Sequence, residues 1–170
     1  MEIFAQIIGV VAMTLGIFSF QAKESSKILM IQTVANCIWA THYLLLGNAA
    51  MGVVLNIYSA IRNVVYYFLN KKENDKNVKI ATITLLVVCC ILGIVFYQNV
   101  WSIFPVIGSL VQAVSFSFKN ANRLRALTLI ASPCWLTYNV ASGSLGGTLT
   151  ETFVICSILI GLWRYRKKEE

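Results

Sequence analysis

The sequence predicts an all-α polytopic membrane protein with seven transmembrane helices, arranged as two parallel three-helix bundles joined by a linker helix. Three observations support this fold class. Apolar residues come in runs of roughly twenty, the length that crosses a bilayer core. Basic residues occur in alternate loops, and the second half of the chain repeats the first at an offset of 96 residues. Of the 170 residues, 58% are hydrophobic and 12% charged, whereas a soluble domain carries about twice that charge.

Seven apolar segments are long enough to cross a bilayer as helices. They are Ile3–Phe20, Ile28–Leu46, Ala49–Leu69, Val78–Tyr97, Val100–Phe118, Leu124–Ser142 and Leu145–Trp163. We interpret the first as a retained helix rather than a signal peptide, because Glu2 precedes it and no small-residue cleavage pattern follows it. The predicted units are residues 1–73 for the first bundle, 74–97 for the linker helix, and 98–170 for the second bundle and a cytoplasmic tail.

The loops between these segments alternate between basic and uncharged. Three loops, 47–48, 98–99 and 143–144, contain no Lys or Arg. The basic residues cluster in the others and in the C-terminal tail: Lys23, Lys27, Lys71, Lys72, Lys76, Lys79, Lys119, Arg123, Arg125, Arg164, Arg166, Lys167 and Lys168. The positive-inside rule then places the N-terminus outside and the C-terminus in the cytoplasm. It also accounts for the net charge of +7 without a nucleic-acid partner.

The internal repeat needs no gap over its matched length. Its pairs include Trp39 with Trp135, Thr41 with Thr137, and Gly47 with Gly143. One crossing helix separates the two predicted triplets, so both have the same orientation and form parallel repeats about an axis along the membrane normal. Repeats of this kind are typical of membrane transporters.

A polar and aromatic stripe follows one face of the second predicted helix and recurs on the sixth. Its members are Gln32, Asn36, Trp39 and Tyr43, and the offset carries them onto Thr128, Ser132, Trp135 and Asn139. Amide groups are costly in lipid, so both stripes should face protein or water. For Gln32, Thr128 and Ser132 we favour hydrogen bonding between helices. For the two tryptophans we favour a ligand platform over core packing, because an indole face stacks on a sugar ring or nucleobase.

The third and fifth helices complete the predicted site. The candidate substrate-binding residues are Trp39, Trp135, Asn36, Asn56, Asn139, Tyr43 and Gln112. Glycines at positions 9, 16 and 52 are expected to allow close helix packing. Five cysteines without ligand spacing and a single histidine, His42, predict neither a metal site nor a disulfide framework. No cofactor is expected.

Two charged residues inside predicted spans are candidates for charge or coupling roles. Inserting an arginine into a membrane span costs about 2.5–3.5 kcal/mol of free energy, so Arg62 needs an explanation. It snorkels to the cytoplasmic interface, pairs with a carboxylate, or binds an anionic substrate. Glu151 is a proton-coupling group or has a structural role near the outer mouth. A pair between Arg62 and Glu151 would have to close a gap of roughly 10 Å in depth.

Two stretches carry a resemblance to a known family. WATHYLLLGNAAMGVVLNIYSAIRN (Trp39–Asn63) and GGTLTETFVICSILIGLWRYR (Gly146–Arg166) resemble the bacterial inner-membrane family called YgjV, and the likeness covers essentially the whole chain. The resemblance implies a multi-pass protein of the bacterial inner membrane.

The helix plan also resembles that of SWEET sugar transporters (MtN3-like and related to PQ-loop proteins) and of the nicotinamide-riboside carriers called PnuC. Two departures stand out. The Pro-Gln signature of the wider group is absent. SWEETs have hinge prolines in both bundles, whereas the hinge candidates here, Pro105 and Pro133, both lie in the second, with Gly9 and Cys37 at the matching positions of the first.

These observations predict a transporter or facilitator of a small polar metabolite, such as a sugar, nucleoside or vitamin-like solute, with a central site between the bundles. The alternative is a membrane-embedded receptor or assembly protein on the same fold. An enzyme is not expected, because the sequence contains no His-Glu-x-x-His motif, Ser/Lys dyad or paired aspartates. The expected partners are the bilayer and a small solute, and the oligomeric state is left open.

Overall fold

The computed structural model describes residues 2–47, 49–71 and 75–165, and within this part of the chain the regular structure is helical throughout. The elements are α1 (Glu2–Ser19), α2 (Ser25–Leu46), α3 (Ala50–Lys71), α4 (Asp75–Val95), the 3₁₀ turn η1 (Val100–Ser102), α5 (Ile103–Phe116), α6 (Ala121–Ala141) and α7 (Leu145–Tyr165). The seven α-helices confirm the all-α prediction. The predicted boundary between residues 73 and 74 lies outside the described residues, as do Lys72, Arg166, Lys167 and Lys168.

The helices begin and end within a few residues of their predicted bounds, with one local difference. The predicted helix Val100–Phe118 begins as a 3₁₀ turn, and the α-helix starts at Ile103. The Asn99 side chain accepts a hydrogen bond from the Trp101 backbone N–H at 3.0 Å. The Ser102 hydroxyl accepts one from the Asn99 N–H at 3.4 Å. These capping contacts tighten the first turn.

The helices differ in how well they fit a bilayer. Among the described residues, α2, α4 and α7 are long and apolar enough to cross a membrane, while Phe4–Ser19 and Val100–Phe116 are shorter apolar helices. α3 and α6 have 22 and 21 residues but carry the buried Arg62 and Arg125. The protein is therefore an all-α membrane protein, and the crossing of the bilayer by every helix stays a prediction.

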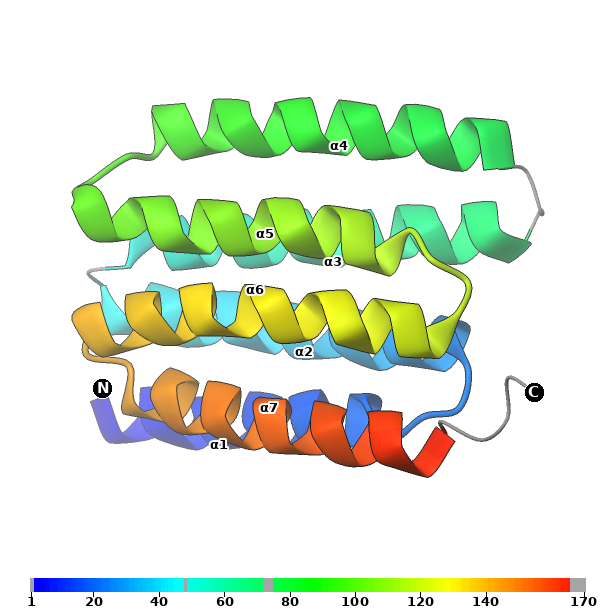
Figure 1. Ribbon diagram of the computed structural model, residues 1–170. Coiled ribbons are helices and arrows are strands. Elements are labelled where there is room, and N and C mark those ends of the chain that lie inside the picture. Colours follow the sequence, from blue (N-terminus) through cyan, green and yellow to red (C-terminus); the bar gives the residue numbers. More distant parts are fainter. Residues whose placement is uncertain (1, 48, 72–74, 166–170) are drawn as a thin grey trace.

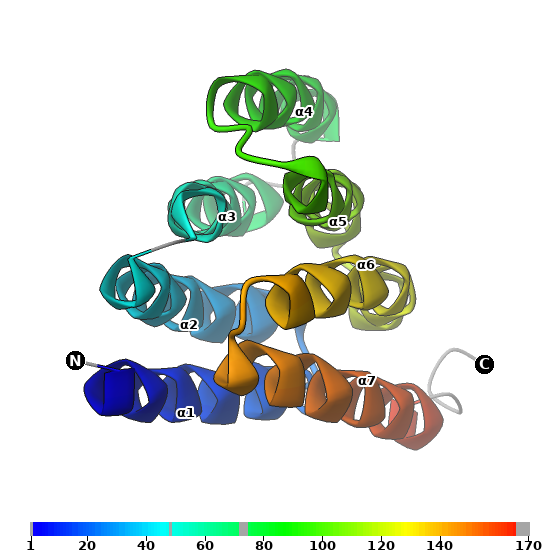
Figure 2. The same ribbon diagram turned by 90° about the vertical axis from the view of Figure 1, so that its left-hand side faces the viewer.

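Helices distant in sequence lie side by side. Figure 2 shows α1 beside α7, α2 beside α6 and α3 beside α5, with α4 covering α3 and α5, and the helix contacts agree. The 96-residue offset carries α1 onto α5 and α3 onto α7. The contact between α1 and α7 thus becomes the contact between α5 and α3. The division into two bundles and a linker stays a prediction.

The two ends of the molecule differ in charge. The turns at 20–24 and 117–120 lie at one end, together with the last residues of α3 and the first residues of α4 (Figure 1). Here Lys119 Nζ lies 3.1 Å from Asp75 Oδ1. We call this the basic end. Gly47 and Gly143, at the opposite end, have φ angles of 76° and 70°, a left-handed conformation that favours glycine. The matched glycines thus share one backbone conformation at what we call the glycine end.

Polarity in this fold is distributed as in a membrane protein. Large aliphatic side chains cover the outside, and in α4 only Leu85 and Cys89 are buried. Asn36, Asn56 and Asn139 are buried inside the molecule. Because lipid satisfies no hydrogen bonds, polar groups are expected to gather in the interior. The cavity described next lies among them.

Candidate functional site

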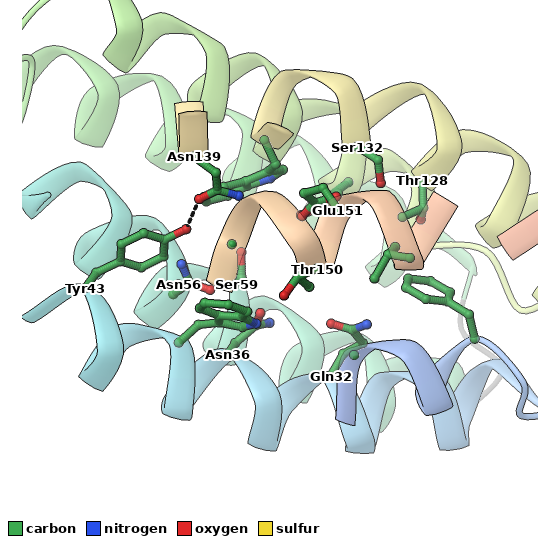
Figure 3. A pocket seen from close by; sticks show the side chains of 17 residues that line it. Gln32, Asn36, Tyr43, Asn56, Ser59, Thr128, Ser132, Asn139, Thr150 and Glu151 are labelled. Atoms are coloured by element: carbon green, nitrogen blue, oxygen red, sulfur yellow. Dashed lines mark hydrogen bonds between the residues drawn. The ribbon is translucent and has the colours of Figure 1, made fainter. Parts of the chain in front are cut away.

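A cavity of about 60 Å³ lies inside the molecule and is lined by residues from every α-helix except α4. Its lining comprises Gly16, Phe20, Gln32, Asn36, Trp39, Tyr43, Asn56, Ser59, Gln112, Thr128, Ser132, Trp135, Asn139, Gly147, Thr150, Glu151 and Val154. Figure 3 shows Tyr43 facing Asn139 at one end, with Gln32 and Thr128 toward the other. The cavity thus lies between α1–α3 and α5–α7.

The structure brings all seven candidate substrate-binding residues to this cavity. The stripes of α2 and α6 face each other across it, and Asn56 from α3, Gln112 from α5 and Glu151 from α7 complete the set. Arg62, Pro105 and Pro133 are not part of the lining. That these residues bind a substrate stays a prediction.

Of the three stripe residues expected to form hydrogen bonds between helices, Gln32 and Thr128 do so. Gln32 Nε2 donates to Ser19 Oγ at 2.7 Å. Thr128 Oγ1 lies 2.9 Å from Ser115 Oγ and donates to the Leu124 carbonyl at 2.8 Å. The buried Ser132 side chain lies beside the Glu151 side chain of α7, and its role in joining helices stays a prediction.

Sequence reasoning missed most of the face that α7 contributes. Besides Glu151, the cavity is lined by Gly147, Thr150 and Val154. These four residues follow the i, i+3, i+4 and i+7 spacing of one helix face. That spacing could have identified this face of α7 from the sequence.

A hydrogen bond between α2 and α6 borders the cavity toward the glycine end. Tyr43 Oη donates to Asn139 Oδ1. Two glycines provide the space: a Cβ at Gly52 would lie 2.7 Å from the Tyr43 ring, and one at Gly147 would overlap the Asn139 amide. Larger residues at either position would displace a bonding partner.

A second set of contacts at this end involves His42, which is fully buried. Its Nδ1 lies 2.8 Å from the Ala5 carbonyl oxygen and its Nε2 lies 3.1 Å from Ser144 Oγ. A carbonyl only accepts, so Nδ1 donates. The Ser144 hydroxyl accepts from the Gly147 N–H at 3.1 Å and donates to Nε2, which satisfies a neutral imidazole. His42 therefore joins α2 to α1 and to the start of α7.

Arg125 holds the basic end together. Its Nε donates to the Phe20 carbonyl at 2.9 Å and its Nη2 to the Ala22 carbonyl. Its Nη1 donates to Asn122 Oδ1 at 2.9 Å, and its Cζ lies 4.9 Å from the Tyr165 ring centroid. The sequence placed Arg125 among the basic loop residues. That interpretation is wrong: Arg125 is a fully buried helix residue that fixes the turn between α1 and α2 to α6.

The same turn is bonded to α7. Gln21 Nε2 donates to the Ser157 carbonyl at 2.8 Å and to its hydroxyl at 2.7 Å, and Tyr165 Oη donates to the Gln21 carbonyl at 3.1 Å. Gly161 allows this approach, since a Cβ there would lie 2.8 Å from Arg125 Nε and 2.9 Å from the Phe20 carbonyl oxygen. The basic end is thus closed by polar contacts across the two triplets.

Arg62 is fully buried between α3 and α5, which overturns the snorkelling interpretation. Its Nε and Nη2 donate to Asn63 Oδ1 at 3.2 and 3.1 Å. Its Cζ lies 4.7 Å from the Phe116 ring centroid and 5.8 Å from that of Tyr58. Aromatic faces stabilise a desolvated guanidinium.

Arg62 and Glu151, whose pairing the sequence left open, do not form an ion pair in the structure. In the described part of the chain the ion pairs are Lys27 with Glu24 and Lys119 with Asp75. Arg62 also lies outside the cavity lining, so the structure gives no support to direct binding of an anionic substrate.

The two prolines occupy different positions. Pro105 is buried near the start of α5, directly after η1. Pro133 lies inside α6, where a proline removes an intrahelical hydrogen bond and favours a kink. The physical reason for a hinge is therefore clearest at Pro133, and a hinge role for either stays a prediction.

An all-α membrane protein with a polar cavity enclosed by its helices and with one basic end is the class that these observations define. The chain belongs to the YgjV family of bacterial inner membrane proteins, whose family model matches residues 3–169. It is 26% identical over 167 residues to the inner membrane protein YgjV of Escherichia coli (strain K12), covering 96% of this chain and 87% of that protein.

No solved structure matches. The predicted family and the inner membrane are thus confirmed, whereas the likeness to SWEET and PnuC proteins stays a prediction.

Proposed function

We propose that the protein is a transporter or facilitator of a small polar metabolite, with its binding site in the cavity between α1–α3 and α5–α7. One observation carries the proposal. The cavity is lined from both triplets, and the repeat-matched pairs Trp39 with Trp135 and Tyr43 with Asn139 all belong to it. A site at the interface of two repeats is the usual location of the substrate in transporters built from repeats.

Unpaired polar atoms support a binding role for the lining. Asn36 Nδ2, Ser59 Oγ and Trp135 Nε1 are buried and have no hydrogen-bond partner among the described residues. A buried donor without a partner costs about 1–3 kcal/mol. A polar solute would satisfy them.

The size of the cavity indicates a contracted conformation. Sites for drug-sized ligands measure roughly 300–1,000 Å³, and this one has a volume of about 60 Å³. A sugar or nucleoside would therefore require the triplets to move apart, whereas a solute of a few heavy atoms would not. The Tyr43–Asn139 bond at one end and the Arg125 contacts at the other are the contacts that such a movement would break.

Solute counterflow in proteoliposomes tests the proposal. We expect exchange of at least one labelled solute from a panel of sugars, nucleosides, amino acids and small amines. Trp39→Ala and Trp135→Ala should abolish exchange. Trp101→Ala is the matched control, because Trp101 is 46% exposed and lies outside the cavity. Absence of exchange by folded wild-type protein across the panel would favour a receptor or assembly role.

The orientation in the membrane is part of the same proposal. The basic end would lie in the cytoplasm and the glycine end outside, because basic loops are retained on the cytoplasmic side. Single cysteines at Ser142 and Asn120 in a cysteine-free background, treated with a membrane-impermeant maleimide in intact cells with a permeabilised outer membrane, test it. Labelling at position 142 and not at 120 is expected, and the reverse pattern would contradict the orientation.

A further inference from the structure

We propose that the solute is a small primary amine, protonated at neutral pH, that also carries an oxygen acceptor a few bonds from its nitrogen. This inference rests on the cavity being the binding site of the transport function proposed above. It narrows the broad class of polar metabolites to solutes with an ammonium group. Charge, aromatic lining, unpaired donors and size each contribute to it.

The charged groups of the cavity favour a cation. Glu151 is its one carboxylate, and its lining includes no Lys, Arg or His. The buried cations of the molecule are directed elsewhere: Arg62 bonds to Asn63, and Arg125 bonds to the turn between α1 and α2. An anionic solute would find no opposite charge in the cavity. An ammonium group would find a carboxylate with which it forms a charge-assisted hydrogen bond, stronger than one between neutral groups.

The aromatic lining adds to this preference. Trp39, Trp135, Tyr43 and Phe20 line the same cavity as Glu151. The faces of aromatic rings attract cations, tryptophan most strongly, and the attraction grows when the cation is desolvated. Both tryptophans are buried, with 8% and 6% exposure. A cavity lined by several aromatic rings and one carboxylate is thus suited to an ammonium group.

The unpaired donors require an acceptor on the same solute. Two of the three asparagines of the lining are engaged, since Asn56 Nδ2 donates to the Gly52 carbonyl at 2.8 Å and Asn139 Oδ1 accepts from Tyr43. Asn36 Nδ2 and Trp135 Nε1 have no partner among the described residues, and both groups can only donate. A hydroxyl, carbonyl or carboxyl oxygen on the solute would accept from them.

The volume favours a small solute. The cavity measures about 60 Å³, well below the roughly 300–1,000 Å³ of sites for drug-sized ligands. Ethanolamine and glycine have the required pair of groups on two carbons. Ethylene glycol has the same size without the charge, and glycolate has the opposite charge.

Thermal unfolding of the purified protein with each of these four compounds tests the inference. Ethanolamine or glycine should raise the melting temperature of the wild type, whereas ethylene glycol and glycolate should not. Glu151→Gln should weaken binding of the amine about tenfold or more. Glu24→Gln is the matched control, because Glu24 is an exposed residue of the basic end. An equal effect of ethylene glycol or glycolate on the wild type, or unchanged amine binding by Glu151→Gln, would overturn the inference.

Two further measurements keep the result interpretable. If Glu151→Gln does not fold, the melting-temperature shifts of the wild type with ethanolamine and with ethylene glycol still test the inference. Asn36→Leu should reduce the shift that ethanolamine and glycine cause. Counterflow separates the two proposals. Exchange of a neutral solute but not of an amine would overturn the amine inference and keep transport. Amine binding without counterflow would keep the inference and overturn transport.

Discussion

Tyr43 donates a hydrogen bond to Asn139, and these two residues occupy equivalent positions of the internal repeat, 96 residues apart. An axis that relates two repeats must pass close to any bond between equivalent residues. The bond therefore marks where such an axis would leave the cavity at the glycine end. Because one partner is a phenol and the other an amide, the site is asymmetric at this point, as expected for binding an asymmetric solute.

Tyr43→Phe removes the donor of this bond and leaves Asn139 Oδ1 buried without it. We expect the free energy of unfolding to fall by about 1–3 kcal/mol, measured by denaturant unfolding in detergent. Tyr97→Phe is the control, since Tyr97 is 54% exposed, and should have no effect. In a double-mutant cycle, Tyr43→Phe with Asn139→Leu should cost less than the sum of the single changes. Strict additivity would show that the two side chains do not interact.

The helices and the cavity stripe could be predicted because their signals are local. A bilayer-length apolar run and a 3.6-residue period are read within one segment. The 96-residue offset then related the stripe of α2 to that of α6, although neither could be known to face a cavity until α1, α3, α5 and α7 were in place around it.

The buried arginines could not be predicted in the same way. Arg125 bonds to carbonyl groups 105 and 103 residues earlier in the chain, and no sequence pattern links an arginine to the backbone of a distant turn. Arg62 was expected to reach the cytoplasmic interface, pair with a carboxylate or bind an anionic substrate. Its neighbours are instead the Phe116 ring and the Asn63 amide, which hydropathy alone does not reveal.

Arg125→Lys should destabilise the basic end. Arg125 donates to three oxygens in different directions, from the Phe20, Ala22 and Asn122 groups, and a lysine ammonium cannot reproduce the planar fork. Hydrogen bonds from a charged group contribute about 1.5–3 kcal/mol each, so we expect the variant to lose at least one such contribution in denaturant unfolding. Arg123→Lys is the control, because Arg123 is an exposed residue in the first helical turn of α6. If Arg125→Lys and Arg123→Lys were equally stable, the contacts of Arg125 would not stabilise the basic end.

Gly161→Ala tests the same contact from the opposite side. The added methyl group would lie 2.8 Å from Arg125 Nε and 2.9 Å from the Phe20 carbonyl oxygen, one of which is backbone. We expect a lower melting temperature. Gly16→Ala is the matched control, because its methyl group would meet only Val154 Cγ2, at 3.9 Å. In a helix, alanine is favoured over glycine by roughly 0.5–1 kcal/mol, so Gly16→Ala should be neutral or stabilising. A gain in stability from both changes would show that α7 has room at Gly161.

Arg62 and Phe116 should be energetically coupled. The guanidinium carbon lies 4.7 Å from the ring centroid, and the arginine is fully buried without a carboxylate, so much of its stabilisation has to come from aromatic faces and from Asn63. A desolvated cation–π contact contributes about 2 kcal/mol. Phe116→Leu should therefore cost more free energy of unfolding in the wild type than in an Arg62→Met background, where only packing is lost.

The relative stabilities of two single variants, Arg62→Met and Arg62→Lys, provide a second test of how the buried charge is stabilised. Methionine has a similar length and carries no charge, and replacing a buried charge by an apolar residue is often neutral or stabilising. Lysine keeps the charge but cannot give two parallel N–H groups to Asn63 Oδ1, which Arg62 does at 3.2 and 3.1 Å. Arg62→Lys should thus be less stable than Arg62→Met. If lysine is instead the better replacement and Phe116→Leu costs the same in both backgrounds, the positive charge is stabilised by something other than the Phe116 ring.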